Sequence, residues 1–212
     1  HGTNRRQRQM CIRDRYLVTG TNVLSSSISA ETIFFLLEQA KKSEVKVVID
    51  LNWREVFWDY SNFASDTSKK GRINLIKNFL NHAHVIKLAK EEATLFFEIE
   101  NPSLISQQMS KRPDVIITDG KNPVSWHING FQGNTKIPKS QKIVDTTGAG
   151  DAFLAGLISE FISFGYPKSE LEIQACVRFA SACGLLTCHG EGAIEPQPDY
   201  EKVSKFLGSL IS

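Results

Sequence analysis

Short runs of consecutive apolar residues recur along the chain and predict the strands of a buried sheet. In VKVVID, residues 45–50, the apolar residues Val47, Val48 and Ile49 are consecutive rather than alternating with polar ones, as in strands covered on both faces in parallel sheets. Asn129-Gly130 lies between two β-prone runs and is a strong signal for a hairpin turn. The predicted strands are 16–19, 45–50, 84–87, 114–118, 124–128 and 131–136.

Between these runs, apolar residues recur every three or four positions, which is the spacing of amphipathic helices. In the first such segment Ile33, Leu37 and Ala40 share one face, and Ser29 is placed to cap the N-terminus. Pro198-Asp199 opens the last segment. The predicted helices cover about 29–42, 72–81, 91–97, 102–110, 148–164, 168–186 and 199–210.

The alternation of strands and helices predicts an α/β fold with a parallel sheet and helices on both faces. Ligand sites in such sheets lie beyond the carboxyl ends of the strands. Residues that directly follow a strand are therefore the first candidates for function. They are Gly20-Thr21, Asn52–Arg54, the stretch after Lys87, and Asp119-Gly120.

Composition excludes several classes of protein. Of the 212 residues, 41% are hydrophobic and 23% charged, and no apolar run reaches the roughly 18 residues of a membrane span. The net charge of +2 is concentrated in residues 1–15, so the rest is mildly acidic and has no electrostatic footprint for nucleic acid. Without a secretion signal, we expect a cytoplasmic protein whose cysteines, Cys176, Cys183 and Cys188 among them, are buried reduced thiols.

The stretch IVDTTGAGDAFLAG, residues 143–156, predicts a glycine turn that leads into a helix. Gly148 and Gly150 allow the backbone to approach a ligand closely. The N–H groups of Gly148, Ala149 and Gly150 would form an anion site at the helix N-terminus, suited to a phosphoryl group. The stretch is neither a Walker A loop nor a dinucleotide fingerprint, because the Lys-Ser/Thr pair and the third glycine are absent.

Asp151 is unexpected in an anion site, because a carboxylate repels phosphate. Beside a transferring phosphoryl group, however, it is placed to take the proton from an attacking hydroxyl. The alternative is that Asp151 only caps the helix.

DTTGAGDAFLAG, residues 145–156, resembles the C-terminal signature of the ribokinase-like (PfkB) carbohydrate kinases. The resemblance extends from about Tyr16 to the C-terminus. It implies a three-layer α/β/α sandwich with a mostly parallel sheet, ATP and Mg²⁺ as cofactors, and often a monovalent cation such as K⁺. It also implies Asp151 as catalytic base, Gly148, Ala149 and Gly150 as anion hole, and Asp145 and Thr147 at the monovalent cation.

Other segments match the family less completely. Thr118 and Gly120 resemble its nucleotide-contacting T-x-G, and His189 and Gly190 lie in a segment, TCHGEG, that resembles the one skirting the adenine. The N-x-x-E motif tied to the metal appears as Ala89-Lys-Glu-Glu92, so Glu92 is the candidate for Mg²⁺ although the asparagine is missing.

D-x-N-x-R, residues 50–54, with Trp58 beyond it, is similar to fructokinase-like members of the family. Asn52 and Arg54 are therefore candidates for binding substrate or phosphate, with bracing of the loop as the alternative. Trp53, Phe57 and Trp58 would either stack on a sugar or pack over the sheet.

Residues 1–15, HGTNRRQRQMCIRDR, do not resemble the family, and the strands that carry its lid and most acceptor contacts are not found before Tyr16. We therefore expect a non-native or disordered tail over 1–15 and a PfkB-type kinase domain, truncated on its N-terminal side, over 16–212. The sheet would then expose an apolar edge.

The sequence thus predicts a kinase that phosphorylates a sugar hydroxyl with ATP, with fructose as the first candidate acceptor. The expected partners are the sugar, ATP and, in the intact protein, a second copy in a homodimer, but neither nucleic acid nor membrane. The alternative is a non-catalytic module of the same fold that binds nucleotide or partners.

Overall fold

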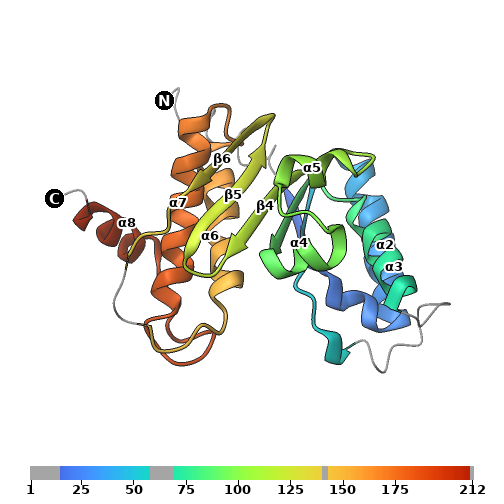
Figure 1. The fold of residues 1–212 in the computed structure, drawn as a ribbon, viewed down its shortest axis with the longest axis horizontal. Coiled ribbons are helices and arrows are strands. Elements are labelled where there is room, and N and C mark those ends of the chain that lie inside the picture. The colour runs from blue at the N-terminus through green and yellow to red at the C-terminus, as the bar shows by residue number, and fades with distance from the viewer. Residues whose placement is uncertain (1–14, 58–68, 140–142, 211–212) are drawn as a thin grey trace. The chain divides into compact units, whose positions relative to one another are not determined.

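The computed structural model describes residues 15–57, 69–139 and 143–210 (Figure 1). The predicted tail, up to residue 14, and Trp58 lie outside the described residues. The chain divides into two compact units. The N-terminal unit comprises Arg13–Ile117 and Trp126–Ile128, and the C-terminal unit comprises Thr118–Ser125 and Asn129–Ser212.

All six predicted strands are present, each within two residues of its predicted ends. They form one sheet in the order β1-β2-β3-β4-β5-β6, so β1 is an edge strand. β1 pairs with β2 and β2 with β3 in parallel, with Gly20 opposite Asp50 and Asp50 opposite Lys87. The strands are β1 (Tyr16–Gly20), β2 (Lys46–Asp50), β3 (Val85–Ala89), β4 (Asp114–Asp119), β5 (Asn122–Ile128) and β6 (Phe131–Thr135).

The predicted helices are also present, with two short 3₁₀ segments, η1 and η2, that the pattern did not indicate. Within the described ranges, none of the helices is long and apolar enough to cross a membrane. The helical elements are η1 (Thr21–Ser25), α2 (Ser27–Lys42), η2 (Glu55–Phe57), α3 (Lys69–Leu80), α4 (Lys90–Phe97), α5 (Pro102–Gln107), α6 (Ala149–Phe164), α7 (Glu170–Thr187) and α8 (Tyr200–Ser209).

The predicted N-cap of α2 was wrong. Ser26 occupies that position and α2 begins at Ser27, two residues before Ser29. The Ser29 hydroxyl donates to the carbonyl oxygen of Val23 at 2.6 Å. Ser29 therefore ties the first turn of the helix back to η1. At the other end of the chain, Asp199 caps α8 as expected, since its Oδ1 accepts the N–H of Lys202 at 2.8 Å.

The core of the N-terminal unit explains why its strand sequences are continuously apolar. Ile49 and Leu88 lie in a cluster with buried residues of α2, α3, α4 and α5. Val48, Val85 and Ile116 alternate with them along the strands and are fully buried as well. Strands that are buried on both faces have no polar face, and their sequences therefore contain consecutive apolar residues.

In the C-terminal unit, α6 and α7 pack closely because glycines stand at their contact. A Cβ added to Gly156 would lie 2.6 Å from Cys183 Sγ, and one added to Gly184 would lie 2.8 Å from the carbonyl oxygen of Ala149. Either contact is shorter than real Cβ atoms show. The close approach of the two helices thus depends on these glycines. Cys176, Cys183 and Cys188 are buried free thiols, as predicted.

Candidate active site

The glycine turn leads directly into α6, as the sequence predicted. Gly148 is the N-cap residue and has φ +79° and ψ −3°, in the left-handed region that favours glycine. A Cβ there would also lie 2.8 Å from the Cβ of Ala193. Two independent constraints, backbone conformation and space, therefore require glycine at this position.

The first turn of α6 presents part of the predicted anion site. The N–H of Ala149 donates to the carbonyl oxygen of Thr146 at 3.2 Å, so it is not free as expected. The N–H groups of Gly150 and Asp151 belong to the first helical turn, where no intrahelical acceptor exists. The side chain of Asp151 is exposed. A carboxylate and helix N-terminal donors thus lie together on one turn.

Asp145 connects this turn to the segment that follows α7. Its Oδ1 accepts the N–H of Thr147 at 2.9 Å and the Thr147 hydroxyl at 2.7 Å, and its Oδ2 accepts the N–H of Gly192 at 2.9 Å. The hydroxyl of Thr147, and then the backbone N–H groups of Thr147 and Gly192, hold the pKa of the Asp145 carboxyl below its usual value. Val144 adds a backbone bond to the Cys188 carbonyl oxygen at 2.8 Å.

The predicted nucleotide residues lie in two segments of the C-terminal unit. Thr118 is the penultimate residue of β4, and Gly120, which follows the strand, has φ +53°. His189 and Gly190 follow α7, in the segment that Asp145 holds. A Cβ on Gly190 would lie 2.8 Å from Pro196 Cβ, so this glycine also permits a close approach.

In the N-terminal unit, Asn52 and Arg54 follow β2 as predicted. Asn52 has φ +40°, and its Oδ1 accepts a hydrogen bond from Arg54 Nε at 3.3 Å. Arg54 is exposed. Trp53 lies edge-on to Phe96 of α4, with ring centroids 5.4 Å apart. Of the two alternatives for this tryptophan, the structure supports packing against the core.

Glu92 makes two backbone hydrogen bonds that the sequence did not predict. Its Oε1 accepts the N–H of Trp53 at 2.6 Å, and its Oε2 accepts the N–H of Ala89 at 2.7 Å. Burial raises the pKa of the Glu92 carboxyl, and the two backbone N–H groups oppose that effect. Each oxygen therefore already accepts one backbone N–H group, so that Glu92 connects two segments of the chain.

Next to Glu92 is an ion pair that the sequence analysis missed. Lys87 Nζ lies 3.2 Å from Asp50 Oδ1 and 3.0 Å from Oδ2, and both side chains are buried. The two residues are also partners in the β2–β3 register. The sequence does show a charged residue near the end of each apolar strand. That the two charges are partners follows only from the register of β2 and β3.

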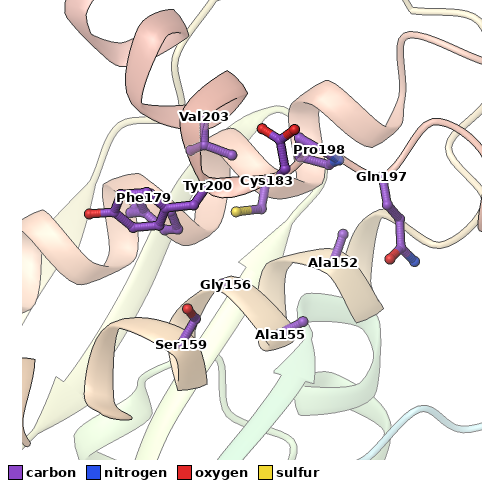
Figure 2. A pocket seen from close by; sticks show the side chains of 11 residues that line it. Ala152, Ala155, Gly156, Ser159, Phe179, Cys183, Gln197, Pro198, Tyr200 and Val203 are labelled. Atoms are coloured by element: carbon purple, nitrogen blue, oxygen red, sulfur yellow. The ribbon is translucent and has the colours of Figure 1, made fainter. Parts of the chain in front are cut away.

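A pocket of about 190 Å³ lies among α6, α7 and the segment leading into α8 (Figure 2). Ala152 and Gly156 line it from α6, and Phe179 and Cys183 line it from α7. Burial, with a smaller contribution from Glu160, raises the pKa of the Cys183 thiol to about 11. The thiol is therefore neutral at pH 7, and the pocket offers apolar packing rather than a nucleophile.

Comparison with solved structures confirms the predicted three-layer α/β/α fold with a mostly parallel sheet. A fructokinase from Vibrio cholerae O395, solved with fructose, ADP and a calcium ion, superposes with a TM-score of 0.78 and 24% identity over 92% of this chain and 61% of that one. An aminoimidazole riboside kinase from Salmonella enterica, complexed with aminoimidazole riboside and an ATP analog, gives 0.75 and 20% identity over 92% and 63%.

Sequence comparison identifies the family. A probable fructokinase-7 from Arabidopsis thaliana is 32% identical over 144 residues, which are 65% of this chain and 41% of that protein. The chain spans about half the length of the curated relatives it matches. The profile of the pfkB family carbohydrate kinases matches residues 7–200, beginning ahead of Tyr16. The chain therefore belongs to the pfkB family of carbohydrate kinases.

Proposed function

We propose that this protein phosphorylates a sugar hydroxyl with ATP, and that fructose is its first candidate acceptor. The observation that carries the proposal is the exposed Asp151 carboxylate in the first turn of α6, where the N–H groups of Gly150 and Asp151 have no intrahelical acceptor. The turn before it requires glycine at Gly148. Family membership and fructokinase relatives support the same conclusion.

In the proposed mechanism, Asp151 accepts the proton of the acceptor hydroxyl. The hydroxyl oxygen then bonds to the γ-phosphorus, and the bond from phosphorus to the bridging oxygen breaks as ADP leaves. The first-turn N–H groups, those of Gly150 and Asp151, and the dipole of α6 stabilise the charge on the transferring oxygens. The proton that Asp151 holds returns to solvent after the product leaves.

Cations enter the proposal in two ways. Mg²⁺ bound with the nucleotide supplies positive charge to the phosphate oxygens. For a monovalent cation such as K⁺, the exposed Thr147 hydroxyl oxygen beside the glycine turn would be a ligand, and Asp145, whose two oxygens already accept hydrogen bonds, would orient it. Glu92 is not proposed as a direct ligand, because each of its oxygens already accepts a backbone N–H group.

Substrates are assigned to segments by position. We propose that Thr118, Gly120, His189 and Gly190 contact the nucleotide, since they lie in the same unit as the glycine turn. Asn52 and Arg54 are proposed to bind the acceptor or its phosphate, because the Arg54 guanidinium is exposed and the Asn52 amide keeps its N–H groups as donors. A cytoplasmic location and a homodimer of the intact protein belong to the same proposal.

The alternative is a non-catalytic module of the same fold, which would bind ATP or partners without transferring a phosphoryl group. The test is ATP-dependent phosphorylation of a panel of sugars and nucleosides, with ATP binding measured in parallel. The chain is compared with a version extended N-terminally by the portion expected from the family. Phosphorylation of one acceptor supports the kinase. Binding of ATP without transfer to any sugar in either version supports the module.

A further inference from the structure

Glu92 joins the ends of two neighbouring parallel strands. One oxygen accepts the N–H of Trp53, in the segment after β2, and the other accepts the N–H of Ala89, the last residue of β3. Both distances, 2.6 and 2.7 Å, are in the range of strong charge-assisted hydrogen bonds. A single carboxylate therefore fixes the spacing of two segments that have no covalent link nearby.

The segment that Glu92 holds contains the strained residue Asn52. Its φ of +40° is uncommon for a residue with a side chain, so the neighbours on both sides must hold it. Before it, Leu51 donates its N–H to the Lys87 carbonyl oxygen at 2.9 Å, and its own carbonyl oxygen accepts the Thr21 hydroxyl. After it, the Trp53 N–H donates to Glu92 Oε1 at 2.6 Å.

The buried ion pair of Asp50 and Lys87 holds the start of the same segment, where β2 ends. A buried ion pair is costly unless both charges are well matched, and here Lys87 reaches both oxygens of Asp50. The ion pair joins β2 to β3 at Asp50 and Lys87, directly before the segment that begins with Leu51. Glu92 joins the same two strands again beyond Asn52, through the N–H groups of Trp53 and Ala89.

We propose that Glu92 is a positioning residue for acceptor recognition, which holds Asn52 and Arg54 in place through the Trp53 amide instead of ligating Mg²⁺. The role in acceptor recognition rests on the proposed function, whereas the bridging of the Trp53 and Ala89 amides by Glu92 does not. Asn52 and Arg54 also bond to each other, so a shift of the backbone between them moves both polar groups together.

The structural part is tested by NMR-detected hydrogen exchange in the full chain. In Glu92→Gln, the carboxamide oxygen can accept from only one of the two amides, so the exchange of Trp53 or Ala89 should accelerate by about 10- to 100-fold. Glu91→Gln is the matched control, because Glu91 is exposed on the same turn of α4. Unchanged exchange at both amides in Glu92→Gln overturns the proposal.

A second variant guards against loss of folding. Glu92→Asp keeps the charge but is one methylene shorter and cannot reach both amides, so it should also accelerate exchange at one of them. Near-ultraviolet circular dichroism reports whether each variant keeps its tertiary structure. Full protection of both amides in a folded Glu92→Asp contradicts the bridging geometry.

The functional part is read from kinetic constants. Glu92→Gln should raise the KM for the acceptor by about tenfold or more, while the KM for ATP and the Mg²⁺ concentration for half-maximal rate stay unchanged. A shift in the Mg²⁺ requirement with an unchanged acceptor KM overturns the proposal in favour of a metal ligand. If the unaltered protein transfers no phosphoryl group, the proposed function and the acceptor part fail, whereas the exchange result still decides the structural part.

Discussion

The backbone N–H of Gly192 donates to Asp145 Oδ2 at 2.9 Å and thereby ties the segment that follows α7 to the turn that begins α6. The other oxygen of Asp145 holds Thr147 through both its N–H and its hydroxyl. Gly148 then approaches Ala193 so closely that no side chain fits between them. The glycine turn is thus preformed by contacts from the segment that follows α7.

Asp145 should make the stability of this region depend on acid. Its pKa is lowered in the folded state, so its stabilising contribution is present above its ordinary value of 3.8 and is lost as pH falls through the lowered folded value. We expect Asp145→Ala to destabilise the chain at pH 7 and to differ progressively less below pH 3.8. Urea unfolding from pH 7 to pH 2 measures this, and a difference independent of pH would contradict it.

Gly148→Ala should destabilise the chain by about 1–3 kcal/mol from the left-handed backbone alone, with an added cost from the overlap with Ala193. Gly208→Ala is the opposite control, because Gly208 lies in α8 with nothing within 4 Å of an added Cβ. Gly208→Ala should raise the free energy of unfolding by roughly 0.5–1 kcal/mol. Urea unfolding of both variants gives the comparison, and equal effects would remove the argument for Gly148.

Ala89→Asn should stabilise α4. Ala89 is the N-cap residue with φ −80° and ψ 158°, and no side chain there accepts a hydrogen bond. An asparagine cap contributes about 0.5–2 kcal/mol relative to alanine. Thermal unfolding of Ala89→Asn and of Ala89→Val, which adds bulk without an acceptor, measures the gain. The account fails here if asparagine is no better than valine.

Glu160→Gln should stabilise the chain increasingly as pH rises. Glu160 is buried, its Oε1 has no hydrogen-bond partner among the described residues, and burial raises the pKa of its carboxyl. The protonated form therefore favours folding, and that contribution is lost as pH rises through the folded value. Denaturation midpoints between pH 4 and pH 8 provide the test, with the exposed Glu170→Gln as control. A pH-independent gain would contradict the assignment.

The fold was largely predictable because its strands and helices have distinct periods. Continuous apolar runs marked β2 and β4, and Asn129-Gly130, both with positive φ, marked the turn between β5 and β6. The start of α2 was wrong because Ser26 and Ser29 are both suitable caps by residue type. Only the contact of Ser29 with Val23 distinguishes them, and that contact depends on η1.

The candidate site was predictable where its residues are consecutive. The glycine turn, Asp151 and the pair of Asp145 and Thr147 lie within seven residues, so local geometry sufficed. The Asp50–Lys87 pair and the contact of Glu92 with Trp53 join residues 37 and 39 positions apart. Such contacts follow from strand register and packing, which the pattern of one segment does not contain.

The central claim is that Asp151 is the base of a phosphoryl transfer. The measurement is the rate of sugar phosphorylation by Asp151→Asn against the unaltered protein, with ATP affinity and thermal stability measured on both and with the exposed Glu201→Gln as control. We predict a loss of about 10²–10⁴-fold in turnover with ATP affinity and stability nearly unchanged. Turnover equal to that of the unaltered protein would remove Asp151 from the mechanism and contradict the account.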